Sequence, residues 1–256
     1  MTDATITPAT DTEQAAPLLV LARATARAIR VLIVAGVPTG VIVVGIGSRL
    51  AMFVLRVTSS DRVNGITSDD GFIIGRFTLS GTYNLLMLGA AVGVIGAAAY
   101  QWVRPWLIGP GWFRSVTLAC ASGAVVGSML VHADGIDFRL LDPWWFAIAL
   151  FVVLPALFAV AIGWAVDHVE RRRVPSGYRR WAVPAVLVLA FPLVLVLLVL
   201  ASLIAAAWFA VRQVVDMSSL ARRPAVALTM RVVWFGVAVL GALALANDIS
   251  EIRQVN

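Results

Sequence analysis

The stretch PWWFAIALFVVLPALFAVAIGWAV, residues 143–166, contains no charged residue. A helix needs about 20 mainly apolar residues to cross the hydrocarbon core of a bilayer, so this stretch predicts a transmembrane helix. Other apolar runs along the chain satisfy the same rule, and together they predict an all-α polytopic membrane bundle of about six helices. The predicted spans are residues 31–55, 82–103, 115–131, 143–166, 181–211 and 227–246.

Composition supports a membrane protein and excludes several other classes. Of the 256 residues, 61% are apolar and 13% are charged, whereas soluble domains contain about 45–50% apolar and about 25% charged residues. A soluble globule of this length cannot bury so much apolar surface. A soluble enzyme, a disordered protein and a nucleic-acid-binding module are therefore excluded. The lipid bilayer is the expected partner of residues 31–246, and no nucleic acid is expected.

The flanking segments differ from the apolar core. Residues 1–30 predict a disordered acidic tail followed by a basic cytoplasmic helix that carries Arg23, Arg27 and Arg30 on one face. The acidic start lacks the positive region of a secretory signal. Residues 247–256 predict a cytoplasmic tail.

Arginines in short loops predict the orientation, because such loops are retained on the cytoplasmic side. The densest group, in residues 171–180, follows the span at 143–166 and places that loop inside. With six spans, both termini are cytoplasmic in a cell membrane. The loop 212–226 conflicts with this scheme, since it carries three arginines and would lie outside. If 181–211 is a re-entrant or surface element, that loop and the last span invert.

Glycines four residues apart occur in three consecutive predicted spans. Such spacing lets two helix backbones approach closely, and packing is the main attraction between helices in lipid. The pattern predicts that these glycines lie between helices in a tight bundle. The pairs are Gly36 and Gly40, Gly89 and Gly93, and Gly123 and Gly127.

Two predicted outside loops contain similar acidic segments, SDDGFIIGRF at 68–77 and HADGIDFRLLD at 132–142. Each has Asp-Gly followed by an arginine, which fits a duplicated helix–loop–helix unit. Their opposite charges predict an extracytoplasmic polar cluster if the loops lie together. Two solvated turns remain the simpler interpretation. The candidate residues are Asp69, Asp70, Arg76, His132, Asp134, Asp137 and Arg139.

Catalytic and metal-binding signatures do not accompany these carboxylates. The sequence contains no G-x-S-x-G, P-loop or H-E-x-x-H motif. His132, Asp134 and Asp137 could bind a metal only with further ligands. No catalytic residue, metal site or cofactor is therefore predicted.

Other charges fall within or beside the spans. Arg49 is an intramembrane charge that either faces the bundle interior or extends to the interface. Asp167, His168 and Glu170 end the span at 143–166 and predict local ion pairs at the membrane edge.

The segments SDDGFIIGRFTLSGT, residues 68–82, and HADGIDFRLLDP, residues 132–143, resemble a group of uncharacterised multi-span membrane proteins from actinobacteria. The resemblance covers roughly residues 36–160. It implies an actinobacterial cell membrane and no substrate.

The sequence favours a non-enzymatic accessory, assembly or sensing factor, because the loops are short and no catalytic signature is present. Its partner would be another membrane protein or a second copy of the chain. The alternatives are a small transporter or channel, and a membrane enzyme that uses the extracytoplasmic carboxylates.

Overall fold

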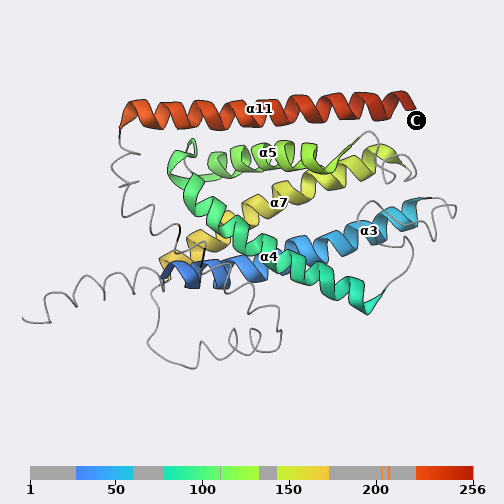
Figure 1. The fold of residues 1–256 in the computed structure, drawn as a ribbon, viewed down its shortest axis with the longest axis horizontal. Coiled ribbons are helices and arrows are strands. Elements are labelled where there is room, and N and C mark those ends of the chain that lie inside the picture. The colour runs from blue at the N-terminus through green and yellow to red at the C-terminus, as the bar shows by residue number, and fades with distance from the viewer. Residues whose placement is uncertain are drawn as a thin grey trace, which may run out of the picture.

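The structure is a computed structural model that describes residues 27–59, 78–109, 111–132, 143–172, 203, 207 and 223–255. Helices make up nearly all of these residues, and no strand occurs among them. Five helices are long and apolar enough to cross a membrane, which confirms the predicted all-α membrane bundle (Figure 1). The predicted span at 181–211 lies outside the described residues, apart from 203 and 207. The five helices are Arg27–Thr58, Leu79–Trp106, Gly111–Leu130, Trp144–Arg171 and Pro224–Gln254.

The first span, Arg27–Thr58, is helical throughout but is not a uniform α-helix. Two π-helical segments, η1 (Leu32–Gly36) and η2 (Gly40–Ile46), flank the short α2 (Val37–Thr39), and α3 (Gly47–Thr58) completes the span. Pro38 lies in α2, where it lacks an N–H and its ring would clash with the carbonyl one turn earlier. Wider π turns accommodate such a break without ending the helix.

The second span combines α4 (Leu79–Val103) with the 3₁₀ turn η4 (Arg104–Trp106). Thr78 caps α4, since its hydroxyl oxygen accepts a hydrogen bond from the Gly81 N–H at 3.2 Å. The next helix, α5 (Gly111–Leu130), follows a short connection in which Gly109 has a φ of 81°. That conformation favours glycine, so the chain reverses direction within a few residues.

The fourth span, α7 (Trp144–Arg171), continues past the predicted end at residue 166. Its last turns carry Asp167, His168 and Glu170, which hydropathy alone assigned to the membrane edge. The fifth described span, α11 (Pro224–Val255), likewise continues beyond the predicted end at residue 246. Polar residues therefore belong to the ends of both helices rather than to the adjoining loops.

A glycine seam joins the first span to α4, which runs antiparallel to it. A Cβ added to Gly36 would lie 2.7 Å from the carbonyl oxygen of Gly93, and one added to Gly40 would overlap the carbonyl of Gly89. The two backbones are thus in direct contact at these glycines. We call the four residues Gly36, Gly40, Gly89 and Gly93 the glycine seam.

The third pair of glycines packs α5 against α7. A Cβ on Gly123 would lie 3.1 Å from the Val152 carbonyl oxygen, and one on Gly127 would lie 3.0 Å from a methyl group of Val152. The Ser122 hydroxyl adds a hydrogen bond of 3.1 Å to the carbonyl oxygen of Pro155. Gly89, Gly93, Gly123 and Gly127 are all buried, as predicted.

The bundle has two distinct ends. At one end, which we call the arginine end, Leu32 packs in one apolar cluster with Leu107, Leu118 and Val166. At the opposite end, a second cluster contains Leu55, Val131, Ala147 and Ile252. Figure 1 shows the arginine end on the left, where the first span begins, α4 ends, α5 begins and α7 ends.

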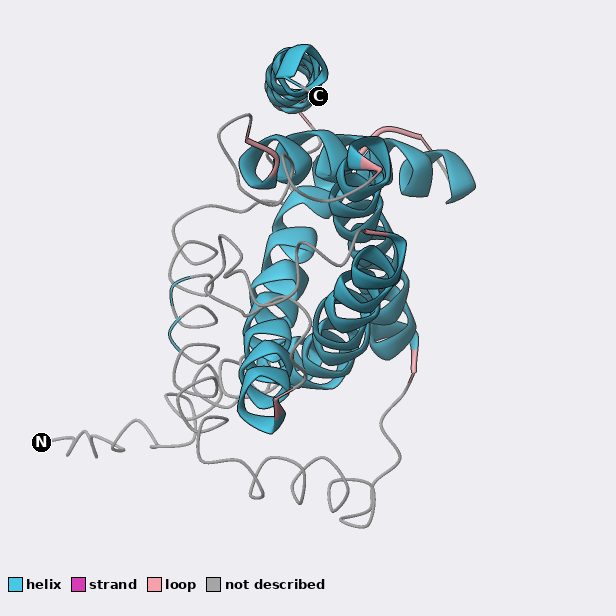
Figure 2. Ribbon diagram, turned by 90° about the vertical axis from the view of Figure 1, so that its right-hand side faces the viewer, coloured by secondary structure: helices cyan, strands magenta, loops and turns pink. Residues whose placement is uncertain are grey.

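Helix α11 runs parallel to α5. Its Trp234 packs against the cluster at the arginine end, a Cβ on Gly241 would lie 2.9 Å from the Cα of Val125, and Ile252 belongs to the opposite cluster. Figure 2 shows this helix, marked by the C-terminus, at the outer edge of the bundle. Large apolar side chains of α11 such as Leu228, Phe235 and Leu240 are exposed on the isolated chain, as expected for a lipid-facing helix.

The direction of α11 bears on the predicted topology. The first span begins at the arginine end and α11 finishes at the opposite end, so the first and last described residues lie on different sides of the bundle. The six-span scheme put both termini on one side, and its alternative inverted the last span. The described helices pack as in that alternative, and the side of a membrane that each terminus faces stays a prediction. Helix α7 ends and α11 begins at the same end, whereas one intervening span would put them on opposite sides.

Candidate functional site

The predicted extracytoplasmic cluster is only partly within the described residues. Asp69, Asp70, Arg76, Asp134, Asp137 and Arg139 lie outside them, and His132 is exposed just after α5. The helix ends that flank the two loops lie together, because Leu55 of α3 packs in one cluster with Val131, which follows α5, and with Ala147 of α7. Both loops therefore leave the bundle from the same end. Pairing of their charges stays a prediction.

Arg49 lies in α3, and part of its guanidinium group is buried in the protein. The residue is half-buried, and its Nε and Nη2 atoms are buried. This favours the interior-facing interpretation over extension to the interface. Arg231, near the start of α11, is exposed instead.

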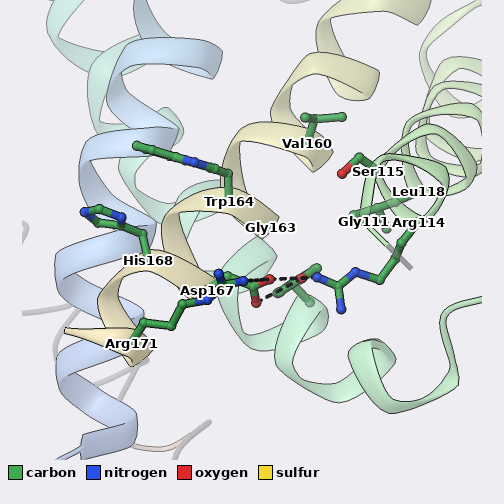
Figure 3. A pocket seen from close by; sticks show the side chains of 11 residues that line it. Gly111, Arg114, Ser115, Leu118, Val160, Gly163, Trp164, Asp167, His168 and Arg171 are labelled. Carbon is green, nitrogen blue, oxygen red and sulfur yellow. Dashed lines mark hydrogen bonds and ion pairs between the residues drawn. The ribbon is translucent and has the colours of Figure 1, made fainter. Parts of the chain in front are cut away.

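A polar cluster that the sequence did not predict as a site lies at the arginine end. Its centre is Asp167 in α7, which is 6% exposed and is the one charged residue buried within the described parts of the chain. Three arginines and a tyrosine surround its carboxylate. Figure 3 shows two of the arginines, Arg114 and Arg171, beside Asp167. We call Tyr100, Arg104, Arg114, Asp167, Glu170 and Arg171 the Asp167 cluster.

Each carboxylate oxygen of Asp167 meets groups from different helices. Oδ2 lies 2.7 Å from Nη2 of Arg114 on α5 and 3.7 Å from Nη2 of Arg171 on α7. Oδ1 accepts a hydrogen bond of 3.2 Å from the Tyr100 hydroxyl on α4 and lies 3.4 Å from Nε of Arg104. Three helices are therefore joined at one carboxylate.

Glu170 completes the cluster. One helical turn after Asp167, it forms an ion pair with Nη1 of Arg104. Three guanidinium groups thus face two carboxylates, which leaves one net positive charge. The arginine side chains are between 29% and 77% exposed, so water screens their outer faces while Asp167 itself is buried.

A pocket of about 230 Å³ adjoins Asp167 between the start of α5 and the end of α7. Figure 3 shows Arg114 and Ser115 on one side of it, with Trp164, His168 and Arg171 on α7. The Trp164 and His168 rings are stacked, with their centroids 5.0 Å apart and an angle of 19° between their planes. The pocket combines cationic groups with an aromatic surface.

Sequence reasoning expected local ion pairs for Asp167, His168 and Glu170 beside the arginine run at 171–180. Asp167 and Glu170 do form ion pairs, whereas His168 stacks on Trp164. Of the partners that the described residues provide, Arg171 comes from that run, and Arg104 and Arg114 come from the preceding helical hairpin. One feature of the sequence could have predicted these pairs: the end of α4, the start of α5 and the end of α7 were all assigned to the same side of the membrane. Tyr100 gave no comparable signal, because it lies inside an apolar run.

Among the described residues, no three His, Cys, Asp or Glu side chains are grouped so that they could hold a metal ion. The polar groups of the Asp167 cluster are cations around one carboxylate, which suits anion binding rather than metal ligation. No protein-family model, curated protein or solved structure matches the chain.

Proposed function

We propose that the protein is a non-enzymatic accessory, assembly or sensing factor of the cell membrane. One observation carries this proposal: four groups from three helices contact the Asp167 carboxylate. A carboxylate that accepts or releases protons or cations during a reaction cycle needs a free coordination position. Asp167 instead joins α4, α5 and α7, which is a structural task.

The bundle also supports a role in assembly. Helix α11 contacts the rest of the bundle along a narrow face, and its other faces carry large apolar side chains. In lipid, such faces are available to another membrane protein or to a second copy of the chain. The partner proposed here is therefore embedded in the membrane.

The arginine distribution supports a cytoplasmic arginine end. Arg27, Arg30, Arg104, Arg114, Arg171, Arg172 and Arg223 lie at this end, and Arg56 and Arg253 lie at the other. Placing the start of α11 inside removes the conflict raised by the arginines of residues 212–226. The proposed topology therefore has the end of α11 outside the cell.

A small transporter or channel is the second candidate, and the first span favours it. Interrupted helices near mid-membrane are typical of transport sites, and η1 and η2 interrupt the α-helix around Pro38. The glycine seam argues against an aqueous path along this helix face, because backbone contacts backbone there. The membrane-enzyme alternative depends on carboxylates outside the described residues.

Single-cysteine labelling tests the topology. In a Cys120→Ser background, cysteines replace the exposed residues Thr58, Arg172 and Gln254. An impermeant maleimide should label positions 58 and 254 in intact cells, and position 172 only after permeabilisation. Labelling at 58 but not at 254 in intact cells would contradict the proposed direction of α11.

Purification and reconstitution test the function. Extraction in mild detergent followed by light scattering should give a complex of fixed stoichiometry, either with another membrane protein or as a homo-oligomer. Liposomes that contain the purified chain should show no solute flux above empty liposomes. A monomer that supports saturable flux would replace the accessory proposal with the transporter.

A further inference from the structure

The lining of the pocket beside Asp167 changes from polar to apolar along the axes of α5 and α7. On α5, Gly111 and Arg114 lie toward the arginine end and Leu118 lies one turn deeper. On α7, Arg171 and His168 lie toward that end, and Val160 lies deeper. The cationic groups are therefore near the membrane surface and the apolar groups are toward its centre.

The electrostatics of the pocket favour an anion. Arg114 and Arg171 both line it and contact Asp167 through Nη2. Each guanidinium has five N–H donors, so these contacts engage only part of its capacity. Asp167 is also paired with Arg104 and Tyr100, which reduces its repulsion of a second anion.

The surface beside the pocket favours a lipid as the source of that anion. Trp164 lines the pocket, is 69% exposed and stacks on His168. An exposed tryptophan near the end of a transmembrane helix is typical of the interface between headgroups and acyl chains. A volume of about 230 Å³ holds a headgroup, while acyl chains would extend along Trp164 into the bilayer.

We propose that this pocket binds the phosphate group of an anionic phospholipid, with Arg114 and Arg171 contacting the phosphate and Trp164 contacting the acyl-chain region. Basic pockets between transmembrane helices recognise such headgroups through the same chemistry. Arginine suits this task because its planar fork binds two phosphate oxygens at once. The inference holds for an accessory factor and for a transporter alike.

The test uses the full-length protein, delipidated in a neutral detergent, and measures its thermal unfolding midpoint during titration with phosphatidylglycerol, phosphatidylcholine or inorganic phosphate. A ligand that binds only the folded state raises this midpoint. Phosphatidylglycerol should raise it and phosphatidylcholine should not. Equal shifts from both lipids would overturn the proposal, and a full shift from inorganic phosphate alone would overturn the lipid as its source.

Matched variants locate the site. Arg171→Gln should weaken phosphatidylglycerol binding about tenfold, the contribution of a hydrogen bond between the phosphate and a charged donor. Arg172→Gln removes the same charge one residue away, from an exposed residue that does not line the pocket, and should leave binding unchanged. Equal losses in both variants would indicate general surface attraction and would overturn the pocket.

A third variant fills the pocket without changing its charge. Ser115→Leu places a larger apolar side chain in the lining and should weaken phosphatidylglycerol binding at least as much as Arg171→Gln. The unfolding midpoint without lipid reports whether each variant folds. Unchanged lipid binding by a folded Ser115→Leu variant would overturn the proposal.

Discussion

Helix α4 takes part in two different kinds of helix contact. Near its middle, Gly89 and Gly93 bring its backbone against that of the first span, so the glycine seam depends on the absence of side chains. At its end, Tyr100 and Arg104 contact Asp167 through hydrogen-bonding and charged groups. Helix packing at the seam depends on the small volume of glycine, and helix packing at the Asp167 cluster depends on opposite charges.

The two contacts should respond differently to mutation. At the seam, each glycine faces backbone of the partner helix, and backbone cannot move aside as a flexible side chain can. In the Asp167 cluster, the peripheral groups share one carboxylate, so the loss of one leaves the others in place. Substitutions at any glycine of the seam should therefore cost similar stability. In the cluster, substitution of Asp167 should cost more than substitution of any one group around it.

The largest effect is expected at the seam. Gly40→Ala would direct a methyl group into the Gly89 carbonyl, which forces the two helices apart. Overpacking of this kind should destabilise the protein by about 3 kcal/mol or more. The measurement is the thermal unfolding midpoint in mild detergent, with size-exclusion chromatography to detect aggregation.

Two alanine variants calibrate that result. Gly236→Ala meets nothing within 4 Å and should leave stability unchanged. Gly123→Ala, whose Cβ would lie 3.1 Å from the Val152 carbonyl oxygen, should cost about 1 kcal/mol because a shift of a few tenths of an ångström relieves the contact. If Gly40→Ala were as stable as Gly236→Ala, the first span and α4 would not meet at the seam.

An intermediate effect is expected at the centre of the Asp167 cluster. Asp167→Asn keeps the size of the side chain but removes the negative charge from among Arg104, Arg114 and Arg171. Breaking a fully buried ion pair costs about 3–5 kcal/mol, and partial exposure of the arginines reduces the expected loss to about 1–3 kcal/mol. Chemical or thermal unfolding in detergent measures it.

Glu170→Gln provides the matched control. This carboxylate is 33% exposed and, among the described residues, pairs only with Arg104, so its loss should cost less than about 1 kcal/mol. High salt should reduce the loss in free energy of unfolding caused by Glu170→Gln more than the loss caused by Asp167→Asn. Salt screens exposed ion pairs more strongly than buried ones. Equal costs for the two variants would mean that Asp167 is not the centre of the cluster.

The same contrast explains what the sequence could predict. All five described spans overlap their predicted positions between residues 31 and 166 and between 227 and 246, because an apolar run of membrane length has few structural alternatives. The seam was also predictable, since residues four apart share a helix face. Burial of both Gly89 and Gly93 follows directly from that spacing.

The Asp167 cluster was not predictable in the same way. Arg114 and Asp167 are 53 residues apart, and Tyr100 and Asp167 are 67 apart. No spacing rule links residues on different helices, so their contact emerges only when α4, α5 and α7 are packed. The direction of α11 relative to α5 likewise comes from packing, whereas the choice between the two predicted topologies by counting spans depends on every segment of the chain.

Apart from the control variants, the smallest effect is expected for Tyr100→Phe. The Tyr100 side chain is buried, and its ring lies against Gly163 of α7, where a Cβ would be 3.0 Å from the ring. Phenylalanine keeps that packing and loses only the hydroxyl, which donates to Asp167 Oδ1 over 3.2 Å. Asp167 retains Arg104 and Arg114, so the carboxylate is not left unsatisfied, and the loss should be about 0.5–1 kcal/mol.

A double-mutant cycle with Asp167→Asn tests whether the stability lost in Tyr100→Phe comes from the contact with Asp167. If the hydroxyl acts through the carboxylate, the two single losses should exceed the double loss by about 0.5 kcal/mol or more, because contacting residues couple. Pairing Tyr100→Phe with Gly123→Ala, which alters the α5–α7 contact at Val152 outside the cluster, should instead give additive losses. Additivity with Asp167→Asn would separate Tyr100 from the cluster and leave the arginines as the sole groups that join α4 and α5 to Asp167.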